Sequence, residues 1–70
     1  MIEKMRLTYV GRDSFCRPVY EADGHYYVDV DPRRDMEPNI CTKYRDEFDG
    51  EPCDHVQAEF VFCPCRDTWY

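Results

Sequence analysis

The strongest constraint on the fold is the sequence Ala22-Asp23-Gly24, which is typical of the turn in a β-hairpin. An Asp-Gly pair tolerates the positive φ angles that a tight turn requires. Extended runs flank it at residues 17–21 and 25–30. In the second run Tyr26, Val28 and Val30 fall on one face, as alternate residues of a strand do. The pattern therefore predicts an antiparallel hairpin.

Two more segments show the same alternation. In residues 5–10 the side chains of Met5, Leu7 and Tyr9 share a face, which predicts a strand that pairs with the hairpin. Residues 56–63 predict a further strand that ends before Pro64. Its core-facing residues are Val56, Ala58, Phe60 and Phe62. We therefore expect a mainly β fold, an antiparallel three-stranded meander plus a C-terminal strand, with a small α+β fold as the alternative.

Residues 31–55 form a long connection in which the strand pattern is lost. Prolines interrupt it at positions 32, 38 and 52, and Gly50 adds a further break. Residues Ile40, Cys41, Tyr44 and Phe48 fall on one helical face, so one short helix or helical turn is predicted across 39–47.

The chain is 70 residues long, which suits a single domain over residues 1–70. A chain of this size buries only roughly 60% of the surface that its unfolded form exposes, so its stability should be modest. Aromatic residues make up 16% of the sequence, and their large rings supply the buried area that a disordered chain lacks.

The net charge of −6 is concentrated in the long connection. Residues 1–28 hold equal numbers of acidic and basic side chains, whereas residues 46–54 are acidic and contain no base. A carboxylate cluster repels nucleic acid, so the fitting partner is a basic protein surface, such as that of a nucleic-acid enzyme. The alternative is a solvated surface that keeps the chain soluble. The predicted partner-binding residues are Asp46, Glu47, Phe48, Asp49, Glu51 and Asp54.

A zinc site is the main chemical alternative, because the residue types that tetrahedral zinc accepts cluster near the C-terminus. The candidate ligands are Cys53, His55, Cys63 and Cys65, with Cys41 as a substitute. Their one-residue separations are shorter than the usual spacing of paired zinc ligands. Zinc is thus a possible cofactor, and elemental analysis of the purified protein would decide the point.

Other classes of site fit the sequence poorly. Asp29 and Asp31 begin like a calcium-binding loop, but arginines follow where a ligand and a glycine belong. The run Cys53-Asp54-His55 lacks the full set of groups that nucleophilic catalysis needs. We therefore predict a protein that is not an enzyme.

The sequence has no apolar run of signal-peptide or membrane-spanning length, so a cytoplasmic location is expected. In that reducing compartment the cysteines should be free thiols. At the C-terminus, Trp69 and Tyr70 suit either the core or a partner contact.

Five motifs resemble those of a group of small proteins from phages and conjugative elements, similar to large-polyvalent-protein-associated domains. The motifs, spread over residues 7–52, are Tyr9-Val10-Gly11-Arg12-Asp13-Ser14, Arg17-Pro18-Val19-Tyr20, Asp29-Val30-Asp31-Pro32-Arg33, Ile40-Cys41-Thr42 and Phe48-Asp49-Gly50-Glu51-Pro52. The resemblance implies a mobile genetic element and assigns no catalytic or ligand-binding residue. With the size and charge of the chain, it favours a protein-binding inhibitor of a host defence enzyme, of the anti-CRISPR or anti-restriction kind. A small zinc-stabilised structural domain is the alternative.

Overall fold

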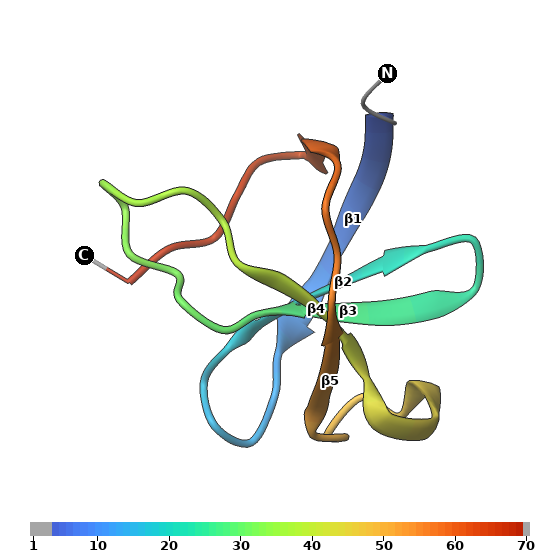
Figure 1. Ribbon diagram of the computed structural model, residues 1–70. Helices are drawn as coiled ribbons and strands as arrows, with labels where there is room; N and C mark the ends of the chain where they lie inside the picture. The colour runs from blue at the N-terminus through green and yellow to red at the C-terminus, as the bar shows by residue number, and fades with distance from the viewer. Residues whose placement is uncertain (1–3, 70) are drawn as a thin grey trace.

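The computed structural model describes residues 4–69 and consists of one curved β-sheet (Figure 1). Strand β1 (Lys4–Arg12) pairs antiparallel with β2 (Pro18–Ala22), which pairs antiparallel with β3 (His25–Asp29). Asp23 and Gly24 lie between the paired residues Ala22 and His25 and have φ angles of 51° and 80°. The turn predicted from Asp-Gly is therefore present.

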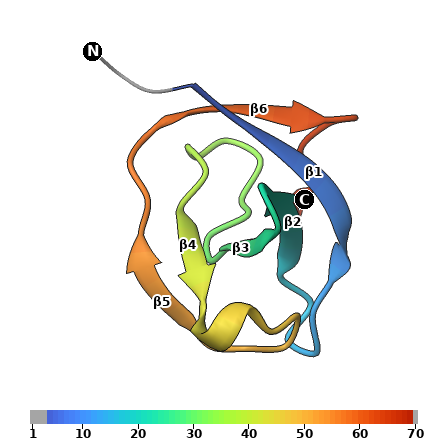
Figure 2. The same ribbon diagram turned by 90° about the vertical axis from the view of Figure 1, so that its right-hand side faces the viewer.

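Three further strands complete the sheet. Strand β4 (Ile40–Lys43) pairs antiparallel with β3, and β5 (Pro52–His55) pairs antiparallel with β4. Strand β6 (Glu59–Cys63) pairs in parallel with β1, so the strand order is β5-β4-β3-β2-β1-β6. The strands are arranged around a ring, as the view turned by 90° shows (Figure 2). The prediction of a mainly β fold is confirmed.

Of the short helix or helical turn predicted across residues 39–47, only a helical turn is present. Residues Ile40–Lys43 form β4, and only a three-residue 3-10 turn, η1 (Tyr44–Asp46), follows. The apolar spacing resembled a helix because both Ile40 and Cys41 are buried, although neighbouring residues of a strand point to opposite faces. The C-terminal strand also differs from the predicted range, because it begins at Glu59.

The inner face of the sheet carries the core. Leu7, Tyr20 and Ile40 are fully buried there. The Tyr20 ring lies 5.0 Å from the Phe62 ring and 5.6 Å from the Tyr9 ring, measured between centroids. Tilted contacts of this kind stabilise a small core beyond the area that they bury. Partly buried residues complete the core: Met5, Tyr9, Ala22, Tyr27, Val56, Phe60 and Phe62.

The opposite face of the sheet is also covered in its centre. Val19 pairs with Val28, and Val28 pairs with Cys41, so these three side chains lie side by side across β2, β3 and β4. Val19 and Val28 are fully buried, and Cys41 is 8% exposed. Central strands buried on both sides lose the apolar-polar alternation that identifies a strand in a sequence.

The C-terminal residues 66–69 run from the end of β6 to the loop after β3, where Trp69 forms a bridge with Arg33. The Trp69 backbone N–H donates to the Pro32 carbonyl at 2.8 Å, and the indole N–H donates to the Cys16 carbonyl at 2.9 Å. Trp69 is 38% exposed, so it is neither a core residue nor a free surface anchor. Tyr70 lies outside the described residues.

Candidate protein-binding surface

The acidic segment, defined as residues 46–54, begins in η1 and runs through β5. Its base is closed by a hydrogen bond from the Tyr44 N–H to the Glu51 carbonyl at 2.8 Å. Within the loop, the Gly50 N–H donates to the Glu47 carbonyl at 3.0 Å. A Cβ on Gly50 would lie 2.5 Å from the Tyr44 carbonyl oxygen, so only glycine fits this loop. These contacts give the segment one defined shape.

Phe48 attaches the acidic segment to the sheet. Its ring meets the Tyr26 ring edge to face, with centroids 5.8 Å apart and planes at 88°. The same ring passes over Gly11, where an added Cβ would lie 3.7 Å from Phe48 Cζ. Phe48 is therefore partly buried against the protein itself. Its structural role is to hold the surrounding carboxylates at fixed positions.

Two polar contacts also fix the segment. The Asp46 carboxylate lies 2.8 Å from Nδ1 of His25, at the start of β3. The Asp49 carboxylate accepts a hydrogen bond from the Ser14 backbone N–H at 2.9 Å. The side chains of His25 and Asp46 are 57% and 47% exposed, so water screens this pair and it contributes little to stability. Asp46 and Asp49 are thus partly engaged within the protein.

A buried charge cluster supports the turn beside the segment. The Lys43 ammonium donates to Asp13 Oδ2 at 2.6 Å, and both side chains are fully buried. The Asp13 carboxylate also accepts from Arg17 Nε and from the backbone N–H groups of Phe15 and Arg17. Burial of Asp13 opposes ionisation, but the hydrogen bonds from Lys43 and Arg17 outweigh it and lower the pKa of Asp13 to about 2. Because Lys43 directly precedes Tyr44, this cluster fixes the position where the loop leaves β4.

Three carboxylates of the segment remain available. Glu47, Glu51 and Asp54 are exposed. Within residues 4–69 their side chains take part in no hydrogen bond or ion pair. The nearest base along the chain, Arg45, lies over the Tyr44 ring with its guanidinium carbon 5.3 Å from the centroid. The segment therefore presents three unpaired negative charges, two on a fixed loop and one on β5.

The four candidate zinc ligands lie on two separate strands or just beyond them. Cys53 and His55 are on β5, whereas Cys63 ends β6 and Cys65 follows it. These strands are at opposite ends of the sheet order. In the part of the chain that the structure describes, no group of three or more His, Cys, Asp or Glu side chains is placed to hold a metal ion. Cys41 is buried on β4, and burial, followed by nearby acidic groups, raises the pKa of its thiol.

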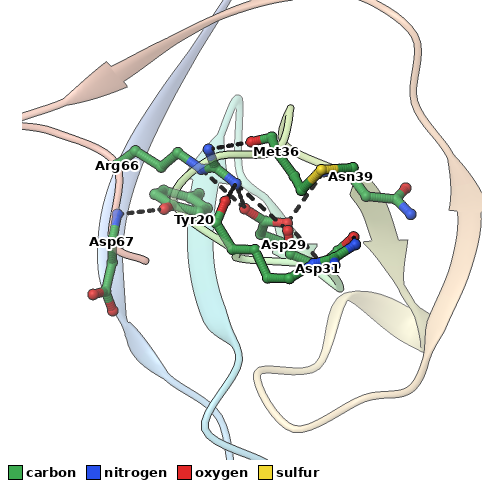
Figure 3. A network of polar contacts seen from close by, with 8 residues as sticks. Tyr20, Asp29, Asp31, Met36, Asn39, Arg66 and Asp67 are labelled. Carbon is green, nitrogen blue, oxygen red and sulfur yellow. Dashed lines mark hydrogen bonds and ion pairs between the residues drawn. The ribbon is translucent and has the colours of Figure 1, made fainter. Parts of the chain in front are cut away.

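A second polar network joins the C-terminal residues to the loop after β3 (Figure 3). The Arg66 guanidinium donates to the buried Asp29 carboxylate at 3.3 Å and to the Met36 carbonyl at 2.8 Å. Asp29 also accepts from the backbone N–H groups of Asp31 and Asn39. These contacts shape the loop after β3. The sequence did not reveal them, because Asp29 and Arg66 are 37 residues apart.

Comparisons with protein-family models, with curated proteins and with solved structures found no match. Among residues 4–69 there is also no helix that is long and apolar enough to cross a membrane.

Proposed function

We propose that this chain is a non-enzymatic protein-binding module, encoded by a mobile genetic element, that uses the acidic segment to bind a basic protein surface. The observation that carries the proposal is a set of three unpaired carboxylates: Glu47 and Glu51 on the loop held by Phe48 and Gly50, and Asp54 on β5, which follows it. Charges fixed in this way bind without the entropic cost of ordering a flexible loop.

The partner chemistry follows from the sign of the charge. Lysine and arginine side chains that neutralise phosphates in a nucleic-acid enzyme are the natural counterparts of exposed carboxylates. A small domain that occupies these side chains competes directly with DNA or RNA. We therefore infer a cytoplasmic inhibitor of a host defence enzyme, of the anti-CRISPR or anti-restriction type, that does not itself bind nucleic acid.

The test is a competition assay with purified host restriction endonucleases and CRISPR effector nucleases, each loaded with a labelled DNA duplex. The wild-type chain should displace the duplex from its target, and its affinity should fall as salt concentration rises. Neutralising the three free carboxylates together (Glu47→Gln, Glu51→Gln, Asp54→Asn) should weaken binding about tenfold or more.

The matched control neutralises three exposed carboxylates elsewhere that also lack partners within residues 4–69: Glu21→Gln, Asp23→Asn and Glu37→Gln. Both triple variants change the net charge by the same amount, so a loss of binding confined to the first locates the surface. Equal affinity for the two variants would reject the acidic segment as the contact. No displacement from any of these nucleases would reject the inhibitor proposal.

A further inference from the structure

Strand β6 leaves one side of its backbone available for pairing. It is the last strand in the sheet order and pairs only with β1, through five consecutive residue pairs without a bulge. In the described residues, no hydrogen bond reaches the backbone of Glu59–Cys63 from outside this ladder. Figure 2 shows β6 at the rim of the ring, alongside β1. Such an edge offers unpaired N–H and C=O groups to another strand.

The opposite edge of the sheet is protected in ways that β6 is not. Strand β5 begins at Pro52, which lacks an N–H, and the β4–β5 ladder is irregular between Cys41 and Lys43. Prolines and bulges are the devices that natural sheets use to prevent pairing at an edge. The β6 sequence Glu-Phe-Val-Phe-Cys contains neither proline nor lysine. Strand addition is therefore favoured at β6 alone.

We propose that β6 pairs in an antiparallel manner with β6 of a second copy of this chain, so that the protein forms a two-fold symmetric dimer. A two-fold axis at Val61 places this residue opposite itself, Phe60 opposite Phe62, and Glu59 opposite Cys63. The cross-strand Phe60–Phe62 pairs extend the aromatic row that these residues already form, with centroids 6.2 Å apart. They also border an open cavity of about 410 Å³ beside β6, which Pro38 and Ala58 line as well.

Charge complementarity is the reason to choose a second copy as the occupant. The Arg6 Nε–H donates to Cys63 Sγ at 3.2 Å, so its guanidinium lies at the Cys63 end of β6, whereas Glu59 lies at the other end. Antiparallel pairing brings Glu59 of each copy next to Arg6 of the other, twice in the dimer. Parallel pairing would place Glu59 beside Glu59 and is disfavoured.

The dimer should be weak and should respond to salt in a characteristic way. An interface built on five residues of one strand is small, so we expect a dissociation constant on the order of 100 µM. Each copy carries a net charge of −6, and salt screens this mutual repulsion. Salt also screens the Glu59–Arg6 attraction, so the dimer should depend less on salt than binding of the acidic segment to a basic partner does. The two interactions use different strands and can be tested separately.

The first test is analytical ultracentrifugation of the full chain from about 10 µM to about 1 mM. We expect a concentration-dependent monomer–dimer equilibrium. Val61→Lys places like charges opposite each other and should weaken dimerisation at least about fivefold. Val10→Lys is the matched control, because both valines are 41% exposed on strands and Val10 lies outside the β1–β6 pairs. Circular dichroism verifies that both variants are folded.

The second test exchanges charges across the interface. Glu59→Arg and Arg6→Glu should each weaken the dimer, and the double variant should recover it, because the two charges are reversed together. A monomer over the whole concentration range would overturn the proposal, as would a dimer that Val61→Lys leaves intact. Protection of the β6 amides from exchange only when another protein is added would assign this edge to a partner strand instead and would also overturn it.

Discussion

At the scale of single residues, the fully buried ion pair between Asp13 and Lys43 places the strictest requirement on the fold, because neither charge can be left without its partner. Asp13 and Lys43 are both fully shielded from water in a domain whose core is small. A buried pair of this kind adds little net stability compared with apolar residues, because both charges lose their hydration. Its value here lies in position, since it connects the turn before β2 to the end of β4.

We predict that Asp13→Asn strongly destabilises the fold. The substitution keeps an oxygen for the backbone N–H groups of Phe15 and Arg17 but leaves the Lys43 charge buried without a counterion. The expected loss in the free energy of unfolding is about 3 kcal/mol, to be measured by urea denaturation. The matched control is Asp31→Asn, because Asp31 pairs with Arg33 at the exposed surface, where water screens the pair, and its effect on stability should be much smaller.

The double variant Asp13→Asn/Lys43→Met separates pairing from packing. Removing both charges also removes the unpaired ammonium, so most of the lost stability should return. Equal destabilisation by the double and the single variant would show that the hydrogen-bond geometry, and not the buried charge, is what the fold requires.

Asp13 should also make the stability of the fold sensitive to acid. The pKa of Asp13 is lowered to about 2, against about 3.9 in an unfolded chain. The Arg12 hydrogen bond lowers the pKa of Asp67 in the same direction. A group whose pKa is depressed by folding stabilises the protein above its unfolded pKa, and this contribution is lost as the pH falls through the folded value. The free energy of unfolding should therefore be level near pH 5 to 7 and fall between about pH 4 and pH 2.

Urea denaturation at a series of pH values tests this expectation. The Asp13→Asn/Lys43→Met variant should show a shallower decline, because the most strongly shifted carboxyl is absent. If the free energy of unfolding of the wild-type chain began to fall above about pH 5, a different group would be titrating, and the assignment of the acid sensitivity to Asp13 would be contradicted.

At the scale of elements, local signals were readable in the sequence and distant pairings were not. The Asp23-Gly24 turn depends on two adjacent residues, and the β1 face of Met5, Leu7 and Tyr9 depends on simple alternation. By contrast, β4 looked helical because it is buried on both faces. The parallel pairing of β6 with β1 joins Lys4 to Glu59 across most of the chain, and no local pattern encodes it.

The candidate protein-binding surface shows the same difference between local signals, which the sequence reveals, and distant contacts, which it does not. The concentration of carboxylates in residues 46–54 is a property of composition and could be predicted. Which carboxylates are free could not, because the partners of Asp46 and Asp49 are 21 and 35 residues away. Phe48 illustrates the point, since an aromatic residue in an acidic run fits a partner contact as well as the internal contact with Tyr26 that it makes.

At the scale of the whole molecule, the C-terminal residues 66–69 connect parts of the sheet that do not pair with each other. Asp67 accepts hydrogen bonds from Arg12 and Tyr9 of β1, and its backbone N–H donates to the Tyr20 hydroxyl. Arg66 binds Asp29 at the end of β3. These contacts connect the C-terminal segment to β1, β2 and β3, so they add long-range constraints to those of the strand ladders.

We predict that truncation after Cys65 unfolds the chain. It removes the Arg66 guanidinium from the buried Asp29 carboxylate, which alone costs about 3 kcal/mol or more. A core of this size supplies only about 3–5 kcal/mol in total, and the Asp67 contacts are lost as well. Circular dichroism and thermal melting of the truncated chain should therefore show no cooperative transition.

The control for this truncation is Trp69→Phe, which keeps an aromatic ring but removes the hydrogen bond from the indole N–H to the Cys16 carbonyl. That partly exposed contact should contribute about 1 kcal/mol, so the variant should melt cooperatively at a slightly lower temperature. A truncated chain that melts like the wild type would show that residues 66–69 merely lie against a sheet that is already stable. Unfolding of the truncated chain alone would show that the contacts of Arg66 and Asp67 with β1, β2 and β3 are needed for a stable fold.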